Sequence, residues 1–146
     1  MSCIAKWVAG LGLALFVSFL SFWWHGLHTF KIDQIREAAR VIQQFHRRFN
    51  AGEFDKICEE AFGCSGQARS DWNAVLHEVK DRGGQFKAEK NTDIKAYIEP
   101  FSVFATYDSS FEKTEIKEIF ILKRFDGQLR IFTYQTVAKP SGSSVP

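Results

Sequence analysis

The side chains best suited to chemistry in this sequence are four histidines, three cysteines and three tyrosines, and they are spread along the chain. His25 and His28 have a spacing that could place both on one side of a helix, but no further metal ligand accompanies them. Cys58 and Cys64 are separated by five residues rather than by the two of common redox and zinc motifs. No glycine-rich phosphate loop is present. The sequence therefore predicts no catalytic set, no metal site and no cofactor.

A polar group inside an apolar cavity is the remaining route to catalysis, since a cavity can shift the pKa of such a group. His46 lies beside the apolar stripe of the first predicted helix and could border a cavity, although a partly exposed boundary histidine is the more ordinary interpretation. Tyr97, Tyr107 and Tyr134 lie in predicted strands, where half-buried tyrosines are common. We take these four residues as candidates for lining a ligand cavity.

Cys58 and Cys64 give information about the cellular compartment in which the domain lies. If the helix that carries Cys58 stops at Gly63, the chain can fold back far enough for a disulfide with Cys64, whereas a continuous helix would hold the two Cα atoms too far apart. Two buried thiols are the alternative. A disulfide would persist outside the cytoplasm, and on this basis we expect an extracytoplasmic domain.

An uncharged apolar segment of 18 residues runs from Trp7 to Trp24. As a helix it would be about 27 Å long, close to the hydrocarbon thickness of a bilayer. Tryptophans at both ends match the preference of such rings for the lipid–water interface. Because no small-x-small cleavage site follows, we predict an uncleaved single-pass anchor that contacts lipid, with an exported soluble protein as the alternative.

The remaining sequence is organised as one domain. We expect a short N-terminal tail at 1–6, the transmembrane helix at 7–24, a juxtamembrane linker at 25–31, an α+β domain at 32–139 and a disordered tail at 140–146. Fifteen phenylalanines are typical of an aromatic-packed core. The net charge of +2 comes from 19 basic and 17 acidic residues that are interspersed, which argues against a nucleic-acid partner.

Apolar periodicity predicts three helices before the sheet. Residues at steps of three and four mark the first helix from Ile32 to Phe49. A second helix is expected from Glu53, with Phe54, Ile57, Cys58, Ala61 and Phe62 on its inner face. Ser70 is a candidate cap for a third helix, which ends at Gly83-Gly84 and has an inner face of Trp72, Val75, Leu76 and Val79.

Alternating apolar residues predict strands from Phe86 onward. Short strands are expected around Phe86 and around Ile94, followed by one from Phe101 to Tyr107. Two long strands, 115–125 and 128–139, are joined by Asp126-Gly127, a strong hairpin signal. Both faces of the 115–125 strand carry apolar residues, so one face is free for another partner. Ile119 and Ile121 are our candidates for a homodimer face, with coverage by the chain's own loops as the alternative.

Three local strings resemble uncharacterised bacterial envelope domains of the nuclear transport factor 2-like (cystatin-like cone) superfamily. They are FHRRFNAGEFDKI, DWNAVLHEVKDRGG and VFATYDSSFEKTEIKEIFILKRFDGQLRIFTY, within a likeness that covers Asp33 to Val137. The resemblance implies a curved antiparallel sheet wrapped around the helices, a cone-shaped cavity and dimerisation through the sheet. That superfamily includes isomerases and dehydratases as well as non-catalytic binding and assembly domains, so the likeness is informative about fold rather than activity.

These observations favour a non-catalytic, membrane-anchored domain that binds a partner protein or a small apolar ligand at the cell envelope. The alternative from another class is a small-molecule isomerase or dehydratase that uses a polar residue deep in the cone. The presence or absence of an accessible inward Asp, His or Tyr distinguishes the two.

Overall fold

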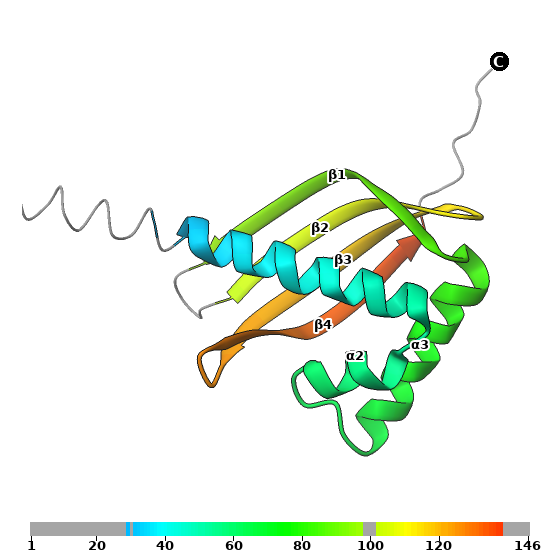
Figure 1. Ribbon diagram of the computed structural model, residues 1–146, viewed down its shortest axis with the longest axis horizontal. Helices are drawn as coiled ribbons and strands as arrows, with labels where there is room; N and C mark the ends of the chain where they lie inside the picture. Colours follow the sequence, from blue (N-terminus) through cyan, green and yellow to red (C-terminus); the bar gives the residue numbers. More distant parts are fainter. Residues whose placement is uncertain (1–28, 30, 98–101, 139–146) are drawn as a thin grey trace, which may run out of the picture. The chain divides into compact units, whose positions relative to one another are not determined.

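The computed structural model describes residue 29, residues 31–97 and residues 102–138 (Figure 1). The chain divides into two compact units, Met1–Asp33 and Gln34–Pro146, and the second is the α+β domain. The predicted transmembrane helix at 7–24 and the tail at 140–146 lie outside the described residues. Among the residues that are described, no helix is long and apolar enough to cross a membrane.

Three helices precede the strands in the described part of the chain, as the periodicity predicted. The first covers residues 31–51 and ends where Gly52 takes a positive φ of 72°. It is followed by α2 (Phe54–Glu60) and α3 (Gln67–Gly83). The predicted cap of α3 is wrong: the helix begins three residues before Ser70, at a reversal where Gly66 occupies the cap position with a φ of 55°.

Four antiparallel strands form one sheet in the order β1-β2-β3-β4. Their bounds are β1 Phe86–Tyr97, β2 Ser102–Phe111, β3 Glu115–Phe125 and β4 Gln128–Ala138. The two short strands that the sequence predicted at the start of the sheet are one long strand, β1. Two register shifts interrupt its pairing with β2, which explains why the sequence alternates irregularly there.

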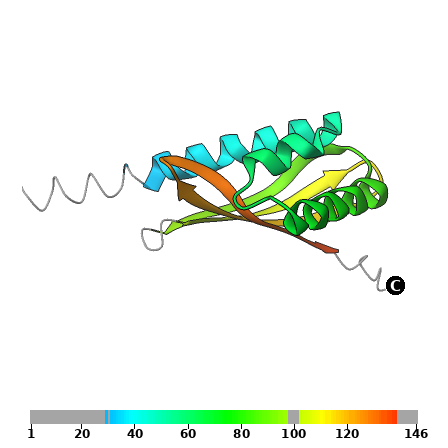
Figure 2. The same ribbon diagram turned by 90° about the horizontal axis from the view of Figure 1, so that it is seen from below.

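All the described helices lie on one face of the sheet (Figure 2). This arrangement confirms the α+β class with helices packed on an antiparallel sheet. Phe45 of the first helix occupies the centre of the contact, with ring centroids 5.2 Å from Phe120 on β3 and 4.8 Å from Tyr134 on β4. Ring packing of this kind stabilises the interface beyond its buried area.

Two residues assigned to inner helical faces are exposed instead. Phe62 lies beyond the end of α2 and packs against β4, where its backbone N–H donates a hydrogen bond to the carbonyl of Ile131 at 2.8 Å. Val75 is exposed on α3, whereas Leu76 and Val79 are buried. The helical pattern alone could not show that α3 buries a narrow stripe around these two residues rather than a broad face.

Candidate functional site

A buried carboxylate lies at the centre of the most concentrated polar chemistry in the domain. Glu118 on β3 has 0% exposure, and three side chains from three other elements surround its two oxygens. Tyr134 of β4 donates its hydroxyl hydrogen to Oε1 at 2.8 Å, and Ser109 of β2 donates to Oε2 at 2.5 Å. Such charge-assisted bonds offset the cost of removing the carboxylate from water.

His46 is the third partner of Glu118 and comes from the first helix. Its Nε2 lies 2.9 Å from Oε2, and because an ionised carboxylate can only accept, Nε2 carries the hydrogen of this bond. The imidazole is 3% exposed and stacks on the ring of Phe86, with centroids 3.8 Å apart and planes within 4°. The expectation of a partly exposed boundary histidine is therefore wrong. The helix stripe is wider than its aliphatic residues suggest, because Glu118 provides a buried partner for an imidazole.

The hydroxyl of Tyr134 is strongly held in its protonated form. Desolvation by burial, followed by the charge of Glu118 and the hydrogen bond to it, raises the pKa of Tyr134 well above its usual range. Burial also raises the pKa of Tyr107 on β2, with smaller contributions from Glu89 and Glu118. Both tyrosines therefore remain neutral at ordinary pH, and each hydroxyl keeps a hydrogen that it can donate.

The hydrogen-bonded cluster around Glu118 is better suited to stabilising the fold than to catalysis. Its members are His46, Ser109, Glu118 and Tyr134. Glu118 and His46 have almost no exposed surface that a substrate could contact. Both oxygens of Glu118 already accept hydrogen bonds. Nδ1 of His46 is buried and has no hydrogen-bond partner. An acid–base residue needs access to the proton it transfers, and burial denies this access to His46 and Glu118.

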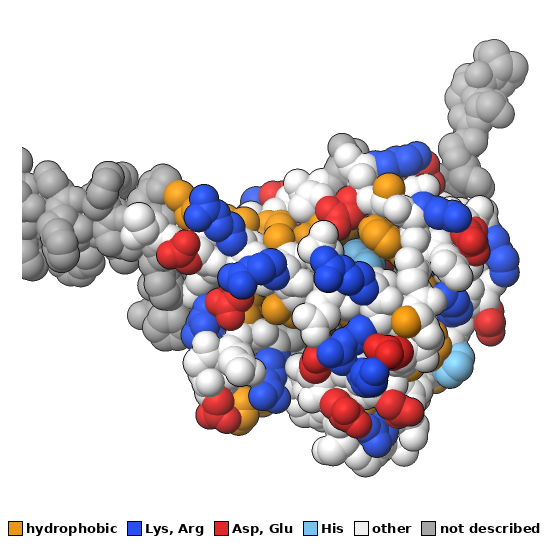
Figure 3. Space-filling view, in the orientation of Figure 1, with side chains coloured by type: hydrophobic (Ala, Val, Ile, Leu, Met, Phe, Trp, Pro, Cys, Tyr) orange, Lys and Arg blue, Asp and Glu red, His pale blue; other side chains and the backbone are white. Residues whose placement is uncertain are grey.

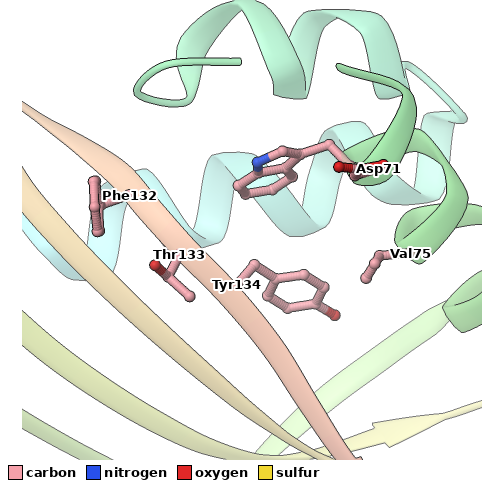
Figure 4. Close-up of a pocket in the computed structure, with 6 residues that line it drawn as sticks. Asp71, Val75, Phe132, Thr133 and Tyr134 are labelled. Atoms are coloured by element: carbon pink, nitrogen blue, oxygen red, sulfur yellow. The ribbon is translucent and has the colours of Figure 1, made fainter. Parts of the chain in front are cut away.

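A cleft of about 220 Å³ opens between α3 and β4 (Figure 4). Its apolar wall consists of Trp72, Val75, Phe132 and the ring of Tyr134, with the ring centroids of Trp72 and Tyr134 6.3 Å apart. Asp71 and Thr133 provide polar groups at its surface. The cleft is larger than the roughly 150 Å³ that accommodates benzene in a protein interior, so it can hold a small organic molecule.

The sheet surface opposite the helices is the other large apolar feature. We call it the open face and define it by Tyr97, Phe104, Ile119 and Ile121. Tyr97 and Phe104 are exposed and in edge-to-face contact at 5.6 Å, and the two isoleucines are half-buried. Alternation along β3 places Ile116, Phe120 and Leu122 toward the helices, so Ile119 and Ile121 point away from them.

The four predicted cavity residues separate into two places. His46 and Tyr134 meet at Glu118, and the ring of Tyr107 lies beside His46 at 6.2 Å, whereas Tyr97 belongs to the open face. Glu118 itself was missed by sequence reasoning. The signal was available, because Glu118 shares the parity of Ile116 and Phe120 and therefore had to point inward.

The cysteine pair forms a disulfide. Cys58 near the end of α2 and Cys64 have Cα atoms 5.3 Å apart and their sulfurs are bonded. The fold-back on which this bond depends occurs where α2 has ended and Gly63 takes a φ of 69°. The bond therefore fixes the corner between α2 and α3.

Within the residues that the structure covers, no group of three or more His, Cys, Asp and Glu side chains could hold a metal ion. Comparison with known proteins adds no assignment: no family model, no curated protein and no solved structure matches the chain.

Proposed function

We propose that this protein is a non-catalytic, membrane-anchored domain that binds a partner protein through the open face of its sheet at the cell envelope. The observation that carries the proposal is the apolar face formed by Tyr97, Phe104, Ile119 and Ile121, which no described helix covers. Contiguous apolar surface of this kind is typical of protein interaction sites. A second copy of the chain is the partner we favour, since one strand face can pair with its own image about a two-fold axis.

The opposite side of the domain supports this choice of surface. The helix-covered side carries Lys and Arg intermixed with Asp and Glu over most of its area (Figure 3). Many of these charges are paired, for example Arg48 with Glu60 and Arg124 with Glu37. Paired charges of this kind are costly to desolvate, whereas the four residues that define the open face carry no charge.

The burial of the His46–Glu118 cluster argues for binding rather than for the isomerase or dehydratase alternative. An enzyme of that kind would require an acid or base at a ligand-accessible position, and the buried pair exposes almost no surface. The enzyme alternative would have to use Asp71 and Tyr134, which line the cleft. The resemblance to the nuclear transport factor 2-like superfamily is compatible with a non-catalytic member and remains a prediction.

The cleft of Trp72 and Tyr134 supports a second candidate, the binding of a small apolar ligand. Its wall is mainly aromatic and its polar groups are few, as is common in sites for small molecules. Replacement of Trp72 with Ala would remove most of this wall. Loss of ligand binding in Trp72→Ala, with binding kept in Ile119→Lys, would favour the cleft over the open face.

The disulfide and the apolar leader support the proposed location. A Cys58–Cys64 bond is favoured in an oxidising compartment, which agrees with a domain outside the cytoplasm.

The anchor is tested by washing membranes with alkaline carbonate, which releases peripheral proteins. We expect the intact chain to stay with the membrane, and its release would contradict the anchored domain.

The partner surface is tested by charge insertion. Ile119→Lys and Ile121→Lys should shift a dimer toward monomer, because each places an ammonium in an apolar interface while the side chain points away from the core. Ala74→Lys on exposed α3 is the matched control. Sedimentation in detergent gives the mass, and an Ile119→Lys protein with unchanged dimer mass would exclude this surface.

A further inference from the structure

Three phenylalanine rings form an exposed cluster that the proposed partner surface does not use. We call it the aromatic end and define it by Phe62, Phe125 and Phe132. Phe62 lies 5.0 Å from Phe125 and 5.7 Å from Phe132, measured between ring centroids. All three rings remain more than one third exposed. Exposed rings leave apolar surface in contact with water, which is unfavourable, so burial of this surface by a partner would be favourable.

Two cations flank the aromatic end. The ammonium of Lys123 lies 3.7 Å from the ring centroid of Phe132, and the guanidinium of Arg130 lies 5.9 Å from that of Phe125. Between residues 123 and 130 the sequence has three cations and one acid, Asp126. Aromatic rings next to Lys and Arg are the composition that partitions into the headgroup layer of a bilayer with anionic lipid.

The position of the aromatic end in the domain fits this partner. Glu37, near the beginning of the domain unit, forms an ion pair with Arg124 and accepts a hydrogen bond from the backbone N–H of Leu129 at 3.1 Å. These contacts hold the β3–β4 hairpin against the start of the first helix, and both lie at the same end of the domain (Figure 1). The domain unit therefore begins beside the β3–β4 hairpin that carries Phe125.

From this geometry we propose that the aromatic end rests on the surface of the bilayer in which the leader is anchored. Phe62, Phe125 and Phe132 enter the interfacial layer, and Lys123 and Arg130 contact anionic headgroups. The proposal rests on the anchored function above, since only twelve residues separate Trp24 from Glu37. Because the interval from residue 31 onward is helical, at most about 35 Å of chain can span it, so the hairpin remains close to the lipid.

A lipid surface fits this end better than a protein partner does. A stable protein interface covers roughly 800 Å² on each partner and involves about 20 or more residues. Three rings and two flanking cations at the end of one hairpin do not cover such an area, whereas the open face extends over the neighbouring strands β1, β2 and β3. The smaller contact at the aromatic end is sufficient for a tethered domain, because the anchor keeps the local concentration of lipid high.

The test is site-specific photocrosslinking of the full chain in vesicles of phosphatidylcholine and phosphatidylglycerol. Benzoylphenylalanine replaces Phe125 in one protein and Val137 in the control. The two residues are exposed to 46% and 49%, and Val137 lies at the opposite end of the strand pair. We expect several-fold more lipid adducts from position 125. Equal yields, or a protein adduct in place of lipid at 125, would overturn the proposal.

Charge reversal provides the second arm. Lys123→Glu combined with Arg130→Glu should lower the lipid adducts at position 125 to the level seen in vesicles of phosphatidylcholine alone, with the melting temperature checked to exclude unfolding. Carbonate extraction of the same vesicles separates the two claims. Release of the chain overturns the anchor and this contact together, whereas retention with equal adduct yields overturns the contact alone.

Discussion

Glu118 shows how one buried residue connects four elements of the domain. Its carboxylate accepts hydrogen bonds from the first helix, β2 and β4 while it lies on β3. Removing such an acceptor leaves several donors without a partner in a medium that cannot replace it. Stability of the domain should therefore depend on this residue more than on any single aliphatic contact around it.

Replacement of Glu118 with Leu should reduce the free energy of unfolding by about 3 kcal/mol or more, because the donors on Ser109, His46 and Tyr134 lose their acceptor. Glu118→Gln keeps the shape and one acceptor oxygen, so we expect a smaller loss. Urea unfolding of the three proteins gives the order. A Leu variant as stable as the original would show that the hydrogen bonds contribute nothing net.

Alkaline pH should destabilise the domain through its buried tyrosines. The pKa of Tyr134 and that of Tyr107 are higher in the folded chain than in the unfolded chain. Their stabilisation is therefore complete below about pH 10 and falls above it, by about 1.4 kcal/mol per pH unit for each tyrosine. Urea unfolding from about pH 8 to about pH 11 measures this slope. Tyr134→Phe should remove about half of this slope and leave the part that is due to Tyr107, and an unchanged slope would contradict the assignment.

Among the elements, the corner between α2 and α3 depends on the disulfide. The bond encloses Phe62, whose ring packs on Phe125 and Phe132 and whose backbone bonds to β4. α2 has only seven residues and cannot hold this geometry by helix formation alone. The covalent bond therefore positions a loop that both the edge of the sheet and the aromatic end require.

Opening this bond should loosen the corner without unfolding the sheet. Cys58→Ser together with Cys64→Ser should lower the free energy of unfolding by about 2 kcal/mol, the loop-closure entropy of a short ring. Thermal unfolding with and without dithiothreitol is the measurement. The reductant should lower the midpoint of the original protein and leave the double variant unaffected. Equal midpoints under both conditions for the original protein would contradict a stabilising bond.

The elements could be predicted from sequence wherever local chemistry decides them. The Asp126-Gly127 turn, the helix stripe through Ile42, Phe45 and Phe49, and the long third and fourth strands follow from periodicity. The start of α3 does not, because a backbone reversal at Gly66, rather than a side-chain cap, decides it. The continuity of β1 is likewise a property of its pairing with β2.

The candidate site was harder to predict than the fold, since it depends on contacts between distant residues. His46 and Glu118 are 72 positions apart, and neither explains its own burial without the other. The open face, in contrast, is visible in the alternation of Ile119 and Ile121 with Phe120 and Leu122. Sequence therefore predicts single-strand patterns well and polar partnerships poorly.

At the scale of the whole molecule, the division at Asp33 and Gln34 predicts an autonomous domain. Among the described residues, the buried core side chains lie between Ala38 and Tyr134, within the second unit. A chain shortened to 32–146 should unfold in one transition. Its midpoint should match that of the full chain in detergent to within about 4 °C, the shift that roughly 1 kcal/mol produces. Circular dichroism is the measurement, and a lower or absent transition would mean that the first unit contributes to folding.

The hydrogen bond from Phe62 to Ile131 also affects whether copies of this protein can aggregate through the edge of the sheet. β4 is the last strand in the order of the sheet, and an unpaired outer strand invites a neighbouring chain to add to it and begin a fibril. The Cys58–Cys64 disulfide holds the loop that carries Phe62 against the outer edge of β4. The register shift opposite Ile121 and Leu122 also bends β4, so that its edge is less suited to pairing with another strand. We therefore expect the Cys58–Cys64 disulfide to protect the protein against self-templated aggregation as well.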